Sequence, residues 1–379
     1  MKVSRRRTGR RLPAGFLPGL VLMLFALAGL KAAGVGPDLP GPHLFSELGI
    51  ASSGTGLLQY CTPKPGLILD PAKPRPAAGS WRKEPNMPVP GAEESSAVLG
   101  GRIYIVGGQD YLGRTTEHVF TFDPKTRTYA RIANLPMKAD HTVSVVYHGQ
   151  LYVVAGYLYS NPIAWLVRYS PRTGKWTVLE KPPTPRGGAG GGVIGHKFYV
   201  AGGAPRSDPN TRVAAYHNLE IYDFRTGHWS RGPDMPTARH HVGAAVVRST
   251  LYVAGGRRPT NQASRDFEGY DARTNRWTRL APLPVGVSAM GLVAHGRDVI
   301  LIAGGNDEGS REGGGYVSPA TWAYDTVKRA WHRLPDLPRG QHASAYTIAD
   351  GRIWSFSGID CPGYHPTGDT YSLPLGSST

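Results

Sequence analysis

A strand that ends on a pair of small residues, usually glycine, recurs six times and constrains the fold of this chain more than any other feature. The repeats read IYIVGG (103–108), LYVVAG (151–156), FYVAGG (198–203), LYVAGG (251–256), ILIAGG (300–305) and IWSFSG (353–358). Glycine at a fixed place lets the backbone turn with φ > 0 where a Cβ atom would collide with its surroundings. The repetition indicates one supersecondary unit used six times.

Two further spacings recur in step with this strand. An aromatic residue is followed seven residues later by proline in all six units, from Trp81 and Pro88 to Trp331 and Pro338. In five units a second aromatic residue precedes the first by seven positions. The units are 47–54 residues long, and each has room for four short strands. Four antiparallel strands per repeat are typical of a β-propeller blade.

The period, the glycine pair, the tyrosine and the tryptophan resemble the kelch repeat over about residues 80–379. This resemblance implies an all-β, six-bladed kelch-type propeller with tryptophans in the wedges between blades. Trp81 lacks a preceding tyrosine and Tyr371 lacks a following tryptophan. We therefore expect residues 80–85 to pair with 369–373 as the missing fourth strand of the last blade. Such closure leaves no exposed sheet edge between the first and last units.

The N-terminus has the composition of an export segment. Residues 1–31 contain seven of the 43 Lys and Arg residues and no acidic residue, and 12–30 are predominantly apolar. A basic stretch before an apolar core is typical of a signal peptide, and 19 residues nearly suffice to cross a bilayer. We expect residues 1–36 to be a signal peptide or signal-anchor transmembrane helix and 37–79 to be a Pro/Gly-rich linker. The propeller, 80–379, would then lie outside the cytoplasm, secreted, periplasmic or membrane-anchored.

Charge argues against one class of partner. The net charge is +16, but beyond residue 31 the 36 basic residues face 27 acidic ones and are scattered along the chain. Nucleic-acid binding requires a clustered basic face, so we predict none. We also expect a monomeric propeller without a cofactor, and membrane contact only through the N-terminal segment.

The chain has two cysteines, Cys61 in the linker and Cys361 in the last repeat. An even number of cysteines in an exported protein favours a disulfide. The sequence leaves open whether these two form a bridge or remain separate thiols.

Length variation is concentrated in the loops that follow the glycine pairs. Variable loops on a rigid scaffold usually carry the binding function, although polar loop residues are common without one. Together with the loops that join the blades, they supply a set of candidate ligand-binding residues: Arg186, Arg206, Asp208, Tyr216, Arg239, His241, Asp307, Glu308, Arg311 and Tyr316.

Four histidines follow their prolines by four or five residues and are expected at one level of the ring: His141, His240, His241 and His342. They belong to separate blades across a wide ring, and no HxH or CxxC spacing supports coordination. We therefore predict no metal site.

Two functions fit these features. The first is an extracytoplasmic binding module that recognises a protein or glycan through the loop face. The second follows from a resemblance to the periplasmic sialic acid mutarotases, which are six-bladed kelch propellers that exchange sugar anomers without a metal. That chemistry needs an acid or base, for which Glu93, Glu94, His240 and His342 are candidates, and a cation such as Arg186 or Arg239.

A third resemblance, to copper radical oxidases of the galactose oxidase type, rests on the kelch repeats alone. That family has seven blades and a Cys–Tyr cross-link, and neither cysteine here lies among inner-face tyrosines. The resemblance therefore gives little support to copper chemistry.

Overall fold

The computed structural model describes residues 80–207, 213–302, 304–306, 316–360 and 364–376. The expected export segment (1–36), the linker (37–79), Cys61 and Cys361 lie outside these residues. Across the described ranges, no helix has both the length and the apolar character needed to span a bilayer.

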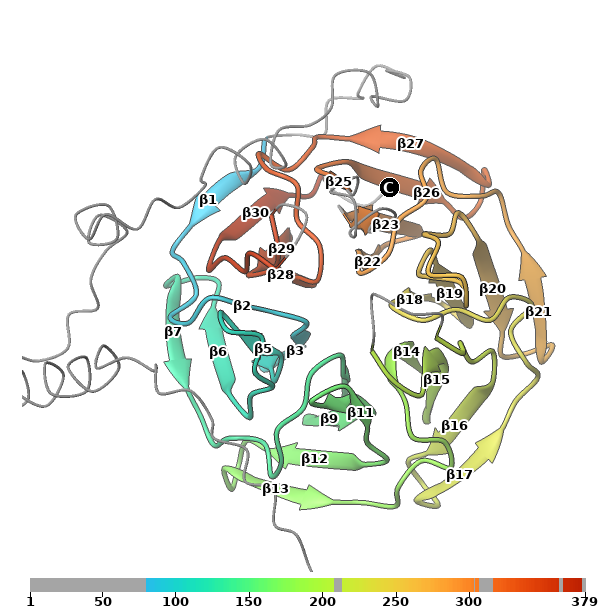
Figure 1. The fold of residues 1–379 in the computed structure, drawn as a ribbon, viewed down its shortest axis with the longest axis horizontal. Coiled ribbons are helices and arrows are strands. Elements are labelled where there is room, and N and C mark those ends of the chain that lie inside the picture. Colours follow the sequence, from blue (N-terminus) through green and yellow to red (C-terminus); the bar gives the residue numbers. More distant parts are fainter. Residues whose placement is uncertain (1–79, 208–212, 303, 307–315, 361–363, 377–379) are drawn as a thin grey trace, which may run out of the picture. The chain divides into compact units, whose positions relative to one another are not determined.

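The described strands form six four-stranded antiparallel sheets, which Figure 1 shows arranged around a central axis. From the axis outward, blade 1 consists of β3 (Ser95–Leu99), β4 (Arg102–Val106), β6 (Val119–Asp123) and β7 (Thr128–Arg131). Blade 2 consists of β8 (Val143–Tyr147), β9 (Gln150–Val154), β12 (Leu166–Ser170) and β13 (Lys175–Val178). Blade 3 consists of β14 (Gly187–Ile194), β15 (Lys197–Ala204), β16 (Leu219–Asp223) and β17 (His228–Arg231).

Blade 4 consists of β18 (Gly243–Val247), β19 (Thr250–Ala254), β20 (Phe267–Asp271) and β21 (Arg276–Arg279). Blade 5 consists of β22 (Gly291–His295), β23 (Asp298–Ile302), β26 (Thr321–Asp325) and β27 (Ala330–Leu334). Blade 6 consists of β28 (Ala345–Ala349), β29 (Arg352–Phe356), β30 (Thr370–Pro374) and β1 (Arg82–Glu84). The innermost strands contact one another in a closed cycle, which confirms the predicted six-bladed, all-β propeller.

Three short antiparallel strand pairs lie next to the glycine pairs of blades 1, 2 and 5. They are β2 (Gly91–Ala92) with β5 (Gln109–Asp110), β10 (Tyr157–Leu158) with β11 (Asn161–Pro162), and β24 (Gly305–Asn306) with β25 (Tyr316–Val317). They lie at the end of the propeller where each first strand begins and each second strand ends. We call this end the loop face.

The ring closes as the sequence predicted. Strand β1 pairs antiparallel with β30, placing Lys83 opposite Tyr371 and Arg82 opposite Ser372. Trp81 is buried in one hydrophobic cluster with Tyr371, and its indole N–H donates to the carbonyl of Pro335 at 2.8 Å. Residues from the two ends of the repeat region therefore complete one blade.

Each outermost strand is fastened to the preceding blade by one aromatic side chain. The indole N–H donates to a backbone carbonyl in five blades: Trp81 to Pro335, Trp176 to Ala133, Trp229 to Glu180, Trp277 to Pro233 and Trp331 to Ala281. In blade 1 the hydroxyl of Tyr129 donates to the carbonyl of Pro85 instead. The repeated tryptophan thus links neighbouring blades, in agreement with the position between blades that the kelch resemblance implied.

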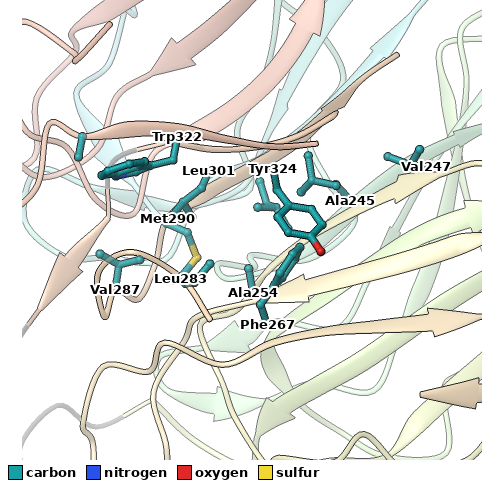
Figure 2. Packing of buried hydrophobic residues seen from close by; sticks show 13 residues of the cluster. Ala245, Val247, Ala254, Phe267, Leu283, Val287, Met290, Leu301, Trp322 and Tyr324 are labelled. Carbon is teal, nitrogen blue, oxygen red and sulfur yellow. The ribbon is translucent and has the colours of Figure 1, made fainter. Parts of the chain in front are cut away.

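Apolar side chains fill the wedges between blades, as the cluster between blades 4 and 5 shows (Figure 2). Phe267 of β20 meets Tyr324 of β26 edge to face, with ring centroids 4.9 Å apart. Burying one aromatic side chain removes roughly 150–250 Å² from water, or about 4–6 kcal/mol as an upper bound. Packing between blades therefore supplies much of the stability.

The glycine pairs mark close approaches between adjacent blades. Gly107 has φ +67°, and a Cβ atom there would lie 2.2 Å from the carbonyl oxygen of Ala139. The amide of Gly108 donates to the same oxygen at 2.9 Å. The backbone must pass so close to the next blade that only a residue without a side chain fits well.

Candidate functional site

A closed ring of backbone hydrogen bonds surrounds the axis on the loop face. One residue from each blade contributes: Glu93, His141, Gly188, His241, Ala289 and Ala343, which we call the axial ring. The amide of each donates to the carbonyl of the ring residue in the preceding blade, with N···O distances of 2.6–3.1 Å. All six have positive φ, between 49° and 63°.

The axial ring borders a cavity of about 190 Å³ on the axis. The ring residues and residues near the start of the six innermost strands line it, among them Ser95, Ser144, Gly190 and Ala244. Ser95 is hydrogen-bonded to Thr142 and to Ser144, so the wall carries hydroxyl groups between blades 1 and 2. The cavity is large enough for several water molecules.

Three axial ring side chains converge. The Nε2 atom of His141 lies 3.2 Å from Oε1 of Glu93 and 3.0 Å from Nε2 of His241. The ring residue between the two histidines is Gly188, where a Cβ atom would lie 3.0 Å from the amide nitrogen of His241. The missing side chain at this position lets the two imidazoles meet.

A second set of side chains contacts the Nδ1 atoms of these imidazoles and fixes their orientation. Nδ1 of His141 lies 2.6 Å from Oδ1 of Asp140, which is 1% exposed. The other carboxylate oxygen of Asp140 accepts hydrogen bonds from the hydroxyl of Thr115 and the amide of Gln109. Nδ1 of His241 lies 2.5 Å from Nδ1 of the buried His240.

Burial and nearby charges shift the pKa values of these side chains in different directions. Burial opposes protonation of His141, but the carboxylates of Glu93 and Asp140 outweigh it and raise the pKa of His141 to about 10. Burial also opposes ionisation of Glu93, and the charge of His141 nevertheless lowers the Glu93 pKa. Burial and the nearby Arg257 lower the pKa of His241, and they lower that of His240 to about 3. The cluster therefore contains one imidazolium and two neutral imidazoles at neutral pH.

Glu94, the neighbour of Glu93, also lines the cavity. Burial raises its pKa to about 8, and the charge of Glu93 adds to that rise. A carboxyl group with such a pKa holds its proton at neutral pH and can exchange it near physiological conditions.

The structure gives Arg186 and Arg239 places inside the blades. They are 1% and 0% exposed and are paired with Glu220 at 2.8 Å and Glu268 at 2.7 Å. Each also donates to the carbonyl of the first glycine of its blade's pair. Through these contacts the two arginines stabilise blades 3 and 4, and they are not accessible cations on the loop face.

The remaining predicted residues fall into three groups. His342 is buried in blade 6 at the position equivalent to His240, and Tyr216 lies with its ring 5.6 Å from the guanidinium of Arg186. Arg206 is exposed, and Tyr316 is in β25. Four residues lie outside the described ranges: Asp208, Asp307, Glu308 and Arg311.

A group of exposed apolar side chains on the loop face is not among the residues predicted from the sequence. Tyr111 and Leu112 of blade 1, Tyr159 of blade 2 and Tyr364 of blade 6 are 54%, 58%, 57% and 39% exposed. We call these four residues the loop patch. The stretches QDYLGR (109–114) and YLYSNP (157–162) carry the signal, because aromatic residues stand where a turn normally has polar ones.

Hydrogen bonds join the three blades under the loop patch. The hydroxyl of Tyr364 donates to the carbonyl of Asp110 at 2.7 Å, and the amide of Tyr159 donates to the hydroxyl of Thr115 at 3.1 Å. Asp110 in turn accepts from the side chain of Arg114 at 2.8 Å and from two loop amides. These hydrogen bonds hold the loops that carry the loop patch in a fixed arrangement.

The expectation that the histidines stay apart across a wide ring is wrong for His141 and His241. Their Nε2 atoms and Oε1 of Glu93 form a set of donor atoms that all lie within 4.8 Å of one another. Such a set is chemically able either to share protons or to hold a metal ion.

Comparison with known proteins identifies the repeat. Residues 193–379 match the KLHDC2/KLHL20/DRC7 Kelch-repeats domain model, and residues 95–136 and 140–183 match the Kelch motif model. The chain is similar to Kelch-like protein terF of Aspergillus terreus, at 29% identity over 80% of this chain and 69% of the relative. It is also similar to mouse Kelch-like protein 36, at 27% identity over 68% of this chain, and spans 42% of that longer protein.

A solved structure titled "Structure of YjhT" has the same fold, with a TM-score of 0.66 and 18% identity over 78% of this chain and 98% of that one. The six blades, the glycine pairs and the matches along the chain agree with one another. This chain belongs to the kelch-repeat β-propeller family.

Proposed function

We propose that this propeller is an extracytoplasmic interaction module that binds a protein partner through the loop patch. The single observation that carries the proposal is the grouping of Tyr111, Leu112, Tyr159 and Tyr364 on one face of three consecutive blades. Exposed tyrosines on a rigid support are typical of the centre of a protein interface.

The surroundings of the loop patch support a protein partner. Tyrosine combines a large apolar area with a hydroxyl and loses little conformational entropy on binding. Arg114, paired with Asp110 beside the loop patch, adds a cation of the kind enriched at interfaces. The Kelch-like relatives are also consistent with protein interaction in general.

The extracytoplasmic location rests on the basic and apolar composition of residues 1–36. Protease added to intact cells that produce the full chain should degrade the propeller if it is exposed at the cell surface, and a secreted or periplasmic form should appear in the corresponding cell fraction. Recovery of the intact propeller only in the cytoplasmic fraction would contradict this location.

The loop patch can be tested with the variant Tyr111→Ser/Tyr159→Ser. Affinity purification from the native host, followed by titration of each recovered protein against the purified chain, should show binding that weakens about 100-fold or more, as expected when two interface tyrosines are lost. Val178→Ser/Val327→Ser is the matched control, because both valines are more than 60% exposed and lie outside the loop patch.

Equal binding by the Tyr111→Ser/Tyr159→Ser variant and the unmodified chain would exclude the loop patch as the interface. A glycan array run in parallel separates the other class of ligand. Tyrosine-dependent binding to glycans, with no protein partner, would replace the protein proposal with carbohydrate recognition.

The sugar mutarotase alternative is favoured by one observation, the carboxyl groups of Glu93 and Glu94 beside the axial cavity. The two arginines expected to hold a sugar carboxylate are buried in ion pairs within their blades. An NMR measurement of anomer exchange with sialic acid tests this activity, and a rate equal to that in buffer would reject it.

A further inference from the structure

We propose that Glu93, His141 and His241 form a binding site for one divalent first-row transition-metal ion on the propeller axis. The ligand atoms are Oε1 of Glu93 and Nε2 of each histidine, and the ion displaces the proton that Nε2 of His141 otherwise carries. This site is separate from the loop patch, and it requires no partner protein.

Two of the three spacings between donor atoms match adjacent positions of a coordination sphere, and the third, between Glu93 and His241, is within 4.8 Å. Nε2 of His141 is 3.2 Å from Oε1 of Glu93 and 3.0 Å from Nε2 of His241. Zinc binds imidazole nitrogen and carboxylate oxygen at about 2.0–2.2 Å, so neighbouring ligand atoms in octahedral or tetrahedral geometry lie about 2.9–3.5 Å apart. Both distances fall in that interval.

The orientation of the histidines also fits metal binding. Nδ1 of His141 is held by the buried carboxylate of Asp140, and Nδ1 of His241 is held by His240. Histidine ligands commonly donate their second ring N–H to a carboxylate or another acceptor, which fixes the ring and directs the other nitrogen at the metal. Here both imidazoles direct Nε2 towards the same point.

The other three positions of the axial ring leave room for further ligands. Gly188, Ala289 and Ala343 contribute no donor side chain, and the cavity of about 190 Å³ adjoins all six positions. Three protein ligands with open positions are characteristic of sites where a metal also binds water or a small molecule. Two imidazoles and one carboxylate suit zinc, iron or a similar ion better than calcium or magnesium, which prefer oxygen ligands.

Titration of the tag-free, full-length chain tests the site. After treatment with a chelator and removal of the chelator, calorimetry with Zn²⁺ should show one equivalent of binding. Glu93→Gln and His241→Ala should each weaken it by at least about 100-fold, because each removes a direct ligand. Asp140→Asn should weaken it about 10–100-fold, as expected for a group that orients a ligand.

Matched controls are available on the outer part of the propeller. His228→Ala and Glu117→Gln remove a histidine and a carboxylate that lie outside the axial ring and are paired with Glu180 and Lys138. Both should bind Zn²⁺ like the unmodified chain. Near-ultraviolet circular dichroism of each variant checks that its fold is retained.

A second measurement uses the unmodified chain and so does not depend on how the variants fold. Co²⁺ in place of Zn²⁺ should give a visible absorption band that saturates at one equivalent and disappears when Zn²⁺ is added. The proposal is overturned if the unmodified chain binds neither ion stoichiometrically. It is also overturned if folded Glu93→Gln and His241→Ala variants both retain full affinity, since the three side chains then form only a hydrogen-bonded cluster.

Discussion

The Nε2 atoms of His141 and His241 lie 3.0 Å apart, although the two residues are separated by 100 positions and belong to blades 2 and 4. No local turn produces this contact. It depends on the backbone ring that joins His141 to Gly188 and Gly188 to His241, and therefore on the propeller being closed. The stability of the closed ring can be tested at several points.

Closure depends on Trp81. Trp81→Ala should lower the free energy of unfolding by about 3–5 kcal/mol, the usual cost of removing a buried aromatic side chain. Trp81→Phe should fall between this variant and the unmodified chain, because it keeps most of the packing against Tyr371 but loses the hydrogen bond to Pro335. Denaturant unfolding measures both, and a change of less than about 0.5 kcal/mol for Trp81→Ala, the range of ordinary surface substitutions, would contradict this role.

The steric need for glycine in a glycine pair can be measured separately from the energetic cost of a positive φ. Gly107 and Gly149 have φ of +67° and +71°, but a Cβ atom meets a carbonyl at 2.2 Å only at Gly107 and meets nothing within 4 Å at Gly149. Gly149→Ala should cost about 1–2 kcal/mol from its left-handed backbone alone. Gly107→Ala should cost about 1–3 kcal/mol more because of the added collision. Equal unfolding midpoints for the two variants would show that the close approach of Gly107 to the neighbouring blade does not affect stability.

The buried pair of Arg239 and Glu268 should respond very differently to single and double substitution. Arg239→Met leaves the Glu268 carboxylate buried without its partner, so we expect a loss of about 3–5 kcal/mol in the free energy of unfolding. Arg239→Met/Glu268→Leu removes both charges and should recover most of that loss. A double variant no more stable than Arg239→Met would indicate that the carbonyl contacts of Arg239, rather than its charge pairing, are decisive.

Asp266 should make stability depend on pH in the acidic range. Burial raises its pKa, but hydrogen bonds from Ser264 and Arg258 and the charge of Arg239 outweigh burial and hold the pKa below its ordinary value of 3.8. The folded state then binds this proton less readily than the unfolded state. The stabilisation is complete above about pH 4 and is lost as pH falls through the pKa of the folded state.

Asp266→Asn should therefore lower the free energy of unfolding at pH 7 by about 1 kcal/mol, a typical value for a hydrogen bond. The difference from the unmodified chain should shrink as the pH is lowered from 4 to 2. Urea unfolding across this range measures it. A difference that stays constant with pH would assign the effect to packing rather than ionisation.

The fold was predictable because each of its requirements recurs along the sequence. The period, the glycine pairs and the unmatched Trp81 and Tyr371 specify the number of blades, the small residues near the axis and the closing strand. These features are repeated locally, so six copies of one pattern reinforce the same prediction.

The site was harder to predict because it arises from differences between the repeats. His141 and His241 could be assigned to one level, but their contact also depends on the absence of a side chain at Gly188, between them in the axial ring. Arg186 and Arg239 resembled accessible loop cations, but their partners Glu220 and Glu268 lie more than 25 residues away on the third strands of the blades. Periodicity places residues at a level of the propeller, whereas side-chain direction and pairing depend on tertiary contacts.

The axial ring has a consequence for how such a propeller can change. Its bonds are all formed by backbone atoms, and glutamate, histidine, glycine and alanine already occupy its six positions with nearly the same φ. The side chains facing the axis can therefore be exchanged without redesigning the scaffold. The axial ring offers six equivalent positions at the centre of the propeller. Its chemistry depends on which of these positions carry a functional side chain.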